Sequence, residues 1–269
     1  MTLANSIGER RPLLPSSSSS ESSESASKSP FWHWCRTHFS RTLEHKSATL
    51  PLAIQCLITG VVSSVFISAN GIWMPFITGT IIQLTNNMTY FLLPPSCRTH
   101  LPYPPHTVEL ATSISMLMLG SFVSGRITTA FGTSMRGKFV GTALLQAVIT
   151  LSACAMMMVG TWNGGFESGS GPRMFPVPAI GAVAFTMGLQ AASSAAFASD
   201  AFATTAAFTA GLVNVLAFPL HEHTPLRAAG IGALILGAGA GNLMVDLPRS
   251  LLWIGLLELV LAGAWSWVE

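Results

Sequence analysis

The sequence predicts an all-α, polytopic membrane protein with six to eight membrane-embedded helices, an inverted repeat with two interrupted helices, and a disordered N-terminal tail. Half of the 269 residues are hydrophobic, only 9% are charged, and the mean hydropathy is +0.54. A soluble domain usually carries about 25% charged residues. Residues 1–49 hold six basic and four acidic residues, whereas the remainder of the chain holds seven of each. The change near Leu50 separates a polar tail (1–49) from a transmembrane domain (50–269).

The tail contains ten serines between residues 16 and 29. Such a segment buries too little apolar surface to offset the entropy lost on ordering, so we expect disorder. Glu9, Leu13 and Leu14 resemble an acidic dileucine sorting motif, in which an acidic residue precedes two bulky aliphatic residues by four and five positions. The motif predicts adaptor proteins as partners and a vacuolar or lysosomal membrane as the destination. A chance match, with the plasma membrane as the destination, is the alternative.

Aromatic and basic side chains alternate over residues 31–47, at the end of the tail. Phe31, Cys35, Phe39 and Leu43 follow i, i+4 spacing. This pattern predicts a short helix that lies in the membrane interface. A plain anchor that sets the depth of the first span explains the pattern equally well.

Eight apolar runs follow the tail, and most approach the roughly 20 residues that cross a bilayer. The runs are 50–70, 72–93, 107–126, 137–161, 178–197, 202–219, 226–245 and 250–268. Glycine is abundant within them, which is typical of transmembrane helices that pack closely.

Two of these runs contain polar residues and glycine in their interior. The run 72–93 carries Thr78, Gly79 and Thr80 and becomes polar from Gln83, while the run 202–219 carries several polar residues and ends at Pro219. Glycine and proline among polar residues indicate interrupted or re-entrant helices.

The distribution of basic residues predicts the topology. Arg126, Arg136 and Lys138 make the loop 127–138 the most basic of the loops between spans. Cytosolic loops are enriched in Lys and Arg, so this loop and the basic tail should share the cytosolic side. The loop and the tail lie on the same side if each interrupted run forms one net crossing with the run before it. The loops 94–106 and 162–177 then face the opposite side. Eight full crossings, which would place the basic loop outside, are the alternative.

On this count each half of the domain makes three net crossings, so the two halves have opposite orientations. A faint repeat supports this, because residues 56–84 laid on 188–216 (an offset of 132) match residues 76–79 to residues 208–211. Residues 117–120, Leu-Met-Leu-Gly, also resemble residues 234–237, Leu-Ile-Leu-Gly. The pattern predicts an inverted repeat.

Four segments resemble motifs of the YoaK-like family of integral membrane proteins, domain of unknown function 1275. They are residues 59–64 (Thr-Gly-Val-Val-Ser-Ser), 76–80 (Phe-Ile-Thr-Gly-Thr), 187–191 (Met-Gly-Leu-Gln-Ala) and 208–211 (Phe-Thr-Ala-Gly). The resemblance implies a helical membrane protein without an established activity. The sequence departs from the family pattern at Ser63, where the family has an acidic residue, and at Thr80 and Ala191, where it has Asn.

Polar residues within the apolar runs are the candidates for a substrate cavity near the membrane midplane. The candidates are Thr78, Gly79, Thr80, Gln83, Gln190, Thr209, Gly211, Asn214 and Glu258. Amides and hydroxyls there would suit a small neutral or zwitterionic solute. The alternative is that they form hydrogen bonds between packed helices. Glu258 is an ionisable side chain in the middle of a span, which predicts a proton or cation site or a polar packing contact.

The favoured function is a carrier or permease for a small solute, and the alternative is a non-transporting membrane scaffold or sensor. We expect no enzyme, because motifs such as HExxH, the P-loop and GxSxG do not occur. The four cysteines lack CxxC spacing, so we expect no metal site and no cofactor. A net charge of +2 indicates no nucleic-acid partner.

Overall fold

The computed structural model describes residues 37–43, 48–98, 106–162, 174–197, 224–244 and 246–268. The helices are α2 (Thr49–Asn70), α3 (Ile77–Leu92), α4 (Pro95–Arg98), α5 (Thr107–Phe131), α6 (Arg136–Trp162), α7 (Val177–Phe197), α9 (Thr224–Asn242) and α10 (Leu247–Trp267). Within these residues, strand pairing is limited to one isolated bridge between Thr42 and Met135. The all-α fold class is confirmed.

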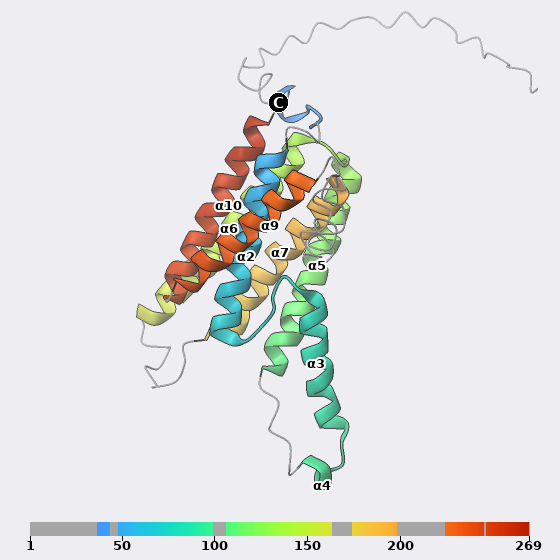
Figure 1. The fold of residues 1–269 in the computed structure, drawn as a ribbon, viewed down its shortest axis with the longest axis vertical. Coiled ribbons are helices and arrows are strands. Elements are labelled where there is room, and N and C mark those ends of the chain that lie inside the picture. The colour runs from blue at the N-terminus through green and yellow to red at the C-terminus, as the bar shows by residue number, and fades with distance from the viewer. Residues whose placement is uncertain are drawn as a thin grey trace, which may run out of the picture.

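Seven of the eight apolar runs form helices, and the eighth, 202–219, lies outside the described residues. Five helices, α2, α5, α6, α7 and α10, are long and apolar enough to cross a membrane. They confirm a multi-pass membrane protein. α9 is a further helix of the bundle and packs along α2 (Figure 1).

The ends of the helices gather at two opposite ends of the bundle (Figure 1). At the first end, which we call the tail end, the Arg136 side chain at the start of α6 binds the Val268 carbonyl oxygen and the His38 ring. At the other end, Asn70 at the end of α2 donates to the Phe175 carbonyl oxygen (3.2 Å) and accepts from the Phe175 amide (3.0 Å) just before α7. The basic loop after α5 therefore lies at the same end as residues 37–43, as predicted.

The helix interruption predicted within 72–93 is present between α2 and α3. α2 ends at Asn70 and is capped by Gly71, whose φ of +67° favours glycine, and the linker that follows buries Ile72 and Met74. Pro75 and Ile77 then line a small cavity together with Thr59 of α2. Thr59 lies 11 residues, or about 16 Å, before Asn70 along α2. The chain thus turns back into the bundle before α3 begins, and α3 then runs towards the end of the bundle opposite the tail (Figure 1).

Glycines set the two closest helix pairs, α2 with α9 and α5 with α7. A Cβ atom on Gly60 would clash with the Leu234 carbonyl oxygen, and one on Gly237 would clash with that of Leu57. In the other pair, a Cβ atom on Gly188 would clash with the Leu117 carbonyl oxygen, and one on Gly120 would clash with the Phe185 carbonyl oxygen. Both pairs run parallel, with backbones in direct contact, so no larger residue fits at these four glycines.

The two crossings correspond to each other, which reveals an inverted repeat. Gly60 of α2 takes the place of Gly188 of α7, and Gly237 of α9 takes the place of Gly120 of α5. α2 and α7 run in opposite directions, because Gln55 contacts Ser194 whereas Asn70 contacts Phe175. α6 and α10 are likewise antiparallel, since Arg136 meets Val268 and Cys154 meets Pro248. The first three bundle helices therefore match the last three with opposite orientation.

The register predicted for this repeat is wrong by one helical turn. The sequence alignment used an offset of 132, but the glycine crossings pair Gly60 with Gly188, an offset of 128. Gly211 lies 23 residues after Gly188, whereas Gly79 lies only 19 after Gly60, so one ungapped offset cannot align both motifs. The match between residues 117–120 and 234–237 agrees with the crossings.

The helix predicted to extend from Phe31 to Leu43 ends early. The helical turn over residues 37–40 gives way to extended backbone, and the Leu43 amide donates to the Ser134 carbonyl oxygen at 2.8 Å. The Arg136 amide donates to the Arg41 carbonyl oxygen at 3.0 Å. Backbone pairing with the loop between α5 and α6 competes with the helix, so this part of the tail docks on the bundle.

Candidate functional site

A small cavity lies where α2, α5, α7 and the start of α3 converge. Its volume is about 30 Å³, enough for about two water molecules. The lining residues are Thr59, Pro75, Ile77, Leu117, Met187, Gln190 and Ala191. Thr59 and Met187 directly precede the crossing glycines Gly60 and Gly188, so the cavity is next to the centre of the inverted repeat.

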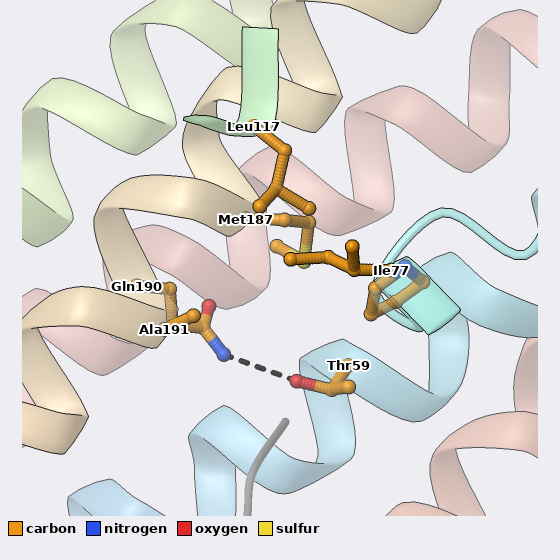
Figure 2. Close-up of a pocket in the computed structure, with 7 residues that line it drawn as sticks. Thr59, Ile77, Leu117, Met187, Gln190 and Ala191 are labelled. Atoms are coloured by element: carbon orange, nitrogen blue, oxygen red, sulfur yellow. Dashed lines mark hydrogen bonds between the residues drawn. The ribbon is translucent and has the colours of Figure 1, made fainter. Parts of the chain in front are cut away.

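Gln190 provides the polar wall of this cavity (Figure 2). Its Nε2 donates to the Gln55 carbonyl oxygen at 3.0 Å and to the Thr59 Oγ1 at 3.2 Å. A backbone carbonyl only accepts hydrogen bonds, so the amide nitrogen must face α2. Its Oε1 is buried and has no partner among the described residues. This oxygen is therefore an acceptor that is available to a small molecule in the cavity.

The groups around Gln190 are held in place by further hydrogen bonds. Ser194 Oγ donates to Gln55 Oε1 at 2.6 Å, and Thr59 Oγ1 donates to the Gln55 carbonyl oxygen at 2.9 Å. Gln55, Thr59, Gln190 and Ser194 are all at most 3% exposed. Because these hydrogen bonds hold Gln55 and Thr59 beside it, the amide of Gln190 is pre-oriented.

The apolar side of the cavity consists of Ile77, Leu117 and Met187 (Figure 2). One unpaired acceptor among apolar side chains can accept a single hydrogen bond from an N–H or O–H group. None of the described residues that line the cavity is charged, so the arrangement disfavours a ligand with net charge.

Among the predicted cavity residues of α3, none lines this central cavity. Thr78 is exposed, and Gly79 packs on the Trp73 ring. Thr80 is buried, but its hydroxyl donates to the Trp73 carbonyl oxygen at 2.8 Å and so closes the first turn of α3. These residues shape the returning linker instead of contacting a solute.

Gln83 lines a second, larger cavity at the end of the bundle opposite the tail. This cavity has a volume of about 480 Å³ and lies between the end of α2, α3 and the start of α5. Its polar wall includes Ser68, Asn70, Gln83, Asn86, Asn87 and His106. The Gln83 amide donates to the Gly71 carbonyl oxygen at 3.1 Å. Gln83 therefore belongs to an outer cavity, which corrects its predicted position beside Gln190.

Glu258 lies apart from both cavities, which corrects its predicted place among the cavity residues. It is fully buried on α10, and the Thr150 side chain of α6 lies next to it. It lines neither the central nor the outer cavity.

Several of the predicted residues lie outside the described part of the chain. They are the cavity candidates Thr209, Gly211 and Asn214 and the sorting motif Glu9, Leu13 and Leu14. Within the described part, no group of three or more His, Cys, Asp or Glu side chains is placed to hold a metal ion.

Gln55, Thr59 and Ser194 were missed by the sequence analysis. A signal was present, because Gln55, Thr59 and Ser63 recur every four residues and so form one polar stripe on an apolar helix. Gln190 and Ser194 have the same spacing on α7. In a membrane such a stripe faces other helices, since lipid offers no hydrogen bonds.

The inverted repeat, the returning linker and the buried polar centre define the class: a multi-pass helical membrane protein built from two inverted halves. The chain belongs to the family described as protein of unknown function (DUF1275), whose model matches residues 52–265. Comparisons with curated proteins and with solved structures find no match.

Proposed function

We propose that the protein is a carrier or permease for a small uncharged or zwitterionic solute that offers an N–H or O–H group. The observation that carries this proposal is the free Gln190 Oε1 in the central cavity. Among the described residues, only the nitrogen end of this amide is bonded. A solute that donates to Oε1 would remove the cost of leaving this acceptor unpaired.

The position of the cavity supports the same proposal. Carriers with inverted repeats bind their solute near the midplane, between the halves and beside an interrupted helix. Here the linker before α3 reaches the cavity through Pro75 and Ile77. A volume of about 30 Å³ fits a closed state, in which the solute enters only after the halves move.

Accessibility of the cavity to water-soluble reagents tests the proposal. In a full-length variant without its native cysteines, Ala191→Cys places a thiol in the cavity wall. We expect a water-soluble thiol reagent to modify it in membranes, because a carrier opens its central site to water. Ala182→Cys is the matched control, since Ala182 is likewise half-buried on α7 but does not line the cavity.

Equal protection of both thiols from either side of the membrane would contradict a carrier. That result would favour the alternative function, a membrane scaffold or sensor, with the polar centre serving only to hold helices together. Modification of Ala191→Cys alone would justify a search for solutes that protect it, starting with small alcohols, amides and amino acids.

We also infer that the tail end of the bundle faces the cytosol, because the loop 127–138 is basic. In sealed membrane vesicles of known orientation, Ser134→Cys in the same background should react only from the cytosolic side, and Ser96→Cys only from the opposite side. Reaction of Ser134→Cys only from the opposite side would reverse the orientation.

The tail motif supports a vacuolar or lysosomal destination, reached through adaptor proteins. Changing Leu13 and Leu14 to Ala should redirect the protein to the cell surface, as seen by microscopy. An unchanged distribution would show that Glu9, Leu13 and Leu14 form no sorting signal. We propose no enzymatic activity and no nucleic-acid partner.

A further inference from the structure

A second buried polar cluster lies between α6 and α10. Gln146 and Thr150 on α6 and Glu258 on α10 are at most 1% exposed. Gln146 Oε1, Thr150 Oγ1 and both carboxyl oxygens of Glu258 lack hydrogen-bond partners among the described residues. Four unpaired buried oxygens at one helix interface are costly, because nothing there replaces the hydrogen bonds of water.

The register of the two helices brings these oxygens to one level. Arg136 meets Val268 at one end of the antiparallel pair, Leu151 lies against Gly255, and Cys154 meets Pro248 at the other end. Interpolation between the Arg136–Val268 and Leu151–Gly255 contacts places Glu258 between the levels of Gln146 and Thr150, and the Thr150 side chain lies next to its carboxyl group. Gln146 and Thr150 are four residues apart, so they share one face of α6.

The cluster lies deep within the membrane-spanning part of the chain. Glu258 is ten residues from Pro248 and nine from Trp267, which bound the apolar span of α10. The described helices that pack on α10 are α6 and α2.

The titratable side chains of these three helices are few. Apart from Glu258 itself, they are Arg136, Lys138 and Cys154 on α6, Cys56 on α2, and Arg249 on α10. Arg136 binds His38 and Val268 at the tail end, and Lys138 donates to the Thr133 carbonyl oxygen at 2.8 Å. Arg249 pairs with Asp246 at the other end. None of these cations neutralises Glu258.

We infer that Glu258, Gln146 and Thr150 form an intramembrane proton-binding site. One proton on a Glu258 oxygen makes an O–H group that can donate to Gln146 Oε1. The Thr150 hydroxyl can then donate to the other Glu258 oxygen. A single bound proton thereby gives all four oxygens a partner and removes the negative charge from the membrane interior.

Release of the proton returns Glu258 to a carboxylate, which Thr150 alone can stabilise by donating its hydroxyl. The uptake and loss of one proton balances charge without any other reactant. If solute movement is coupled to this proton, a proton gradient would drive it; that coupling rests on the proposed carrier function, whereas proton binding does not.

Infrared difference spectroscopy tests proton binding directly. The full-length protein is reconstituted in liposomes, and spectra are recorded as the pH is raised from neutral to alkaline. We expect wild type to lose the C=O stretching band of one protonated carboxyl group. Glu258→Gln should abolish this band, and the control Asp246→Asn should retain it, because Asp246 is partly exposed and paired with Arg249.

Gln146→Leu provides a second readout that keeps the carboxyl group. It removes the proposed acceptor, so the band should persist at a shifted frequency. This readout remains usable if Glu258→Gln fails to fold. An unchanged frequency in Gln146→Leu, or an unchanged band in folded Glu258→Gln, would overturn the inference. Loss of the band on addition of sodium at constant pH would overturn it in favour of a metal-cation site.

Discussion

The two glycine crossings share one backbone geometry and carry different side chains. With Gly60 placed on Gly188, Thr59 of α2 corresponds to Met187 of α7, and Ser63 corresponds to Ala191. Gln190 in turn corresponds to Val62. At each of these three positions, one half therefore carries a polar residue and the other half carries an apolar residue.

This difference separates the scaffold from the site. The glycines allow the backbones to touch in both halves, and van der Waals packing of this kind stabilises helices in lipid. The side chains beside the glycines are free to differ because the crossing does not depend on them. An asymmetric cavity can thus form at the centre of a symmetric framework.

The largest expected effect comes from adding a methyl group at a crossing. Gly60→Ala and Gly188→Ala should each destabilise the folded protein by about 3 kcal/mol or more, because the new Cβ would overlap a backbone carbonyl that cannot move alone. Thermal unfolding in detergent measures the loss. Similar losses in the two variants would support equivalent crossings.

Gly141→Ala is the matched control, since a Cβ at Gly141 on α6 meets no atom within 4 Å. It should be neutral or should stabilise the helix by up to about 1 kcal/mol. A severe loss for only one of Gly60→Ala and Gly188→Ala would break the equivalence of the halves.

A smaller effect is expected at two other glycines, which lie outside the crossings. A Cβ at Gly241 on α9 would lie 2.7 Å from the Val61 carbonyl oxygen, whereas one at Gly181 on α7 would meet side-chain atoms of Thr112 and Met116 at 3.3 and 3.4 Å. Gly241→Ala should therefore cost about 1–2 kcal/mol, and Gly181→Ala should be close to neutral. Equal unfolding temperatures for the two variants would mean that both helices approach their partners equally closely.

Gln190→Leu sharpens the contrast in side chains. It removes two hydrogen bonds to α2, and at about 0.6 kcal/mol for each interhelical bond it should lower stability by about 1 kcal/mol. The protein should still fold, but Ala191→Cys in this background should lose protection by any solute found to shield it. Retained protection would remove Gln190 from the binding site.

Gln83→Leu should have the smallest effect. It removes one hydrogen bond, to the Gly71 carbonyl oxygen in the outer cavity, and should lower stability by about 0.6 kcal/mol. Solute protection of the central cavity should survive, because Gln83 does not line it. Loss of protection in well-folded Gln83→Leu would show that the outer cavity is part of the binding site.

The sequence by itself determined the elements and their membrane character. Apolar length marked seven of the described helices within a few residues. The break in the chain falls at the start of the run 72–93, which was predicted to be interrupted, whereas Gly79 lies within continuous α3. These features are local, because a bilayer demands about 20 apolar residues and internal satisfaction of backbone hydrogen bonds whatever the neighbouring helices are.

Only the tertiary structure decided the register of the repeat and the members of the site. The sequence match favoured an offset of 132, whereas the structure pairs Gly60 of α2 with Gly188 of α7, because each meets the backbone of a facing helix. Likewise, Gln190 joins Gln55 and Thr59 across more than 130 residues of chain, while Glu258 turns towards α6. Such contacts depend on how the helices are rotated and paired, which the composition of each helix leaves open.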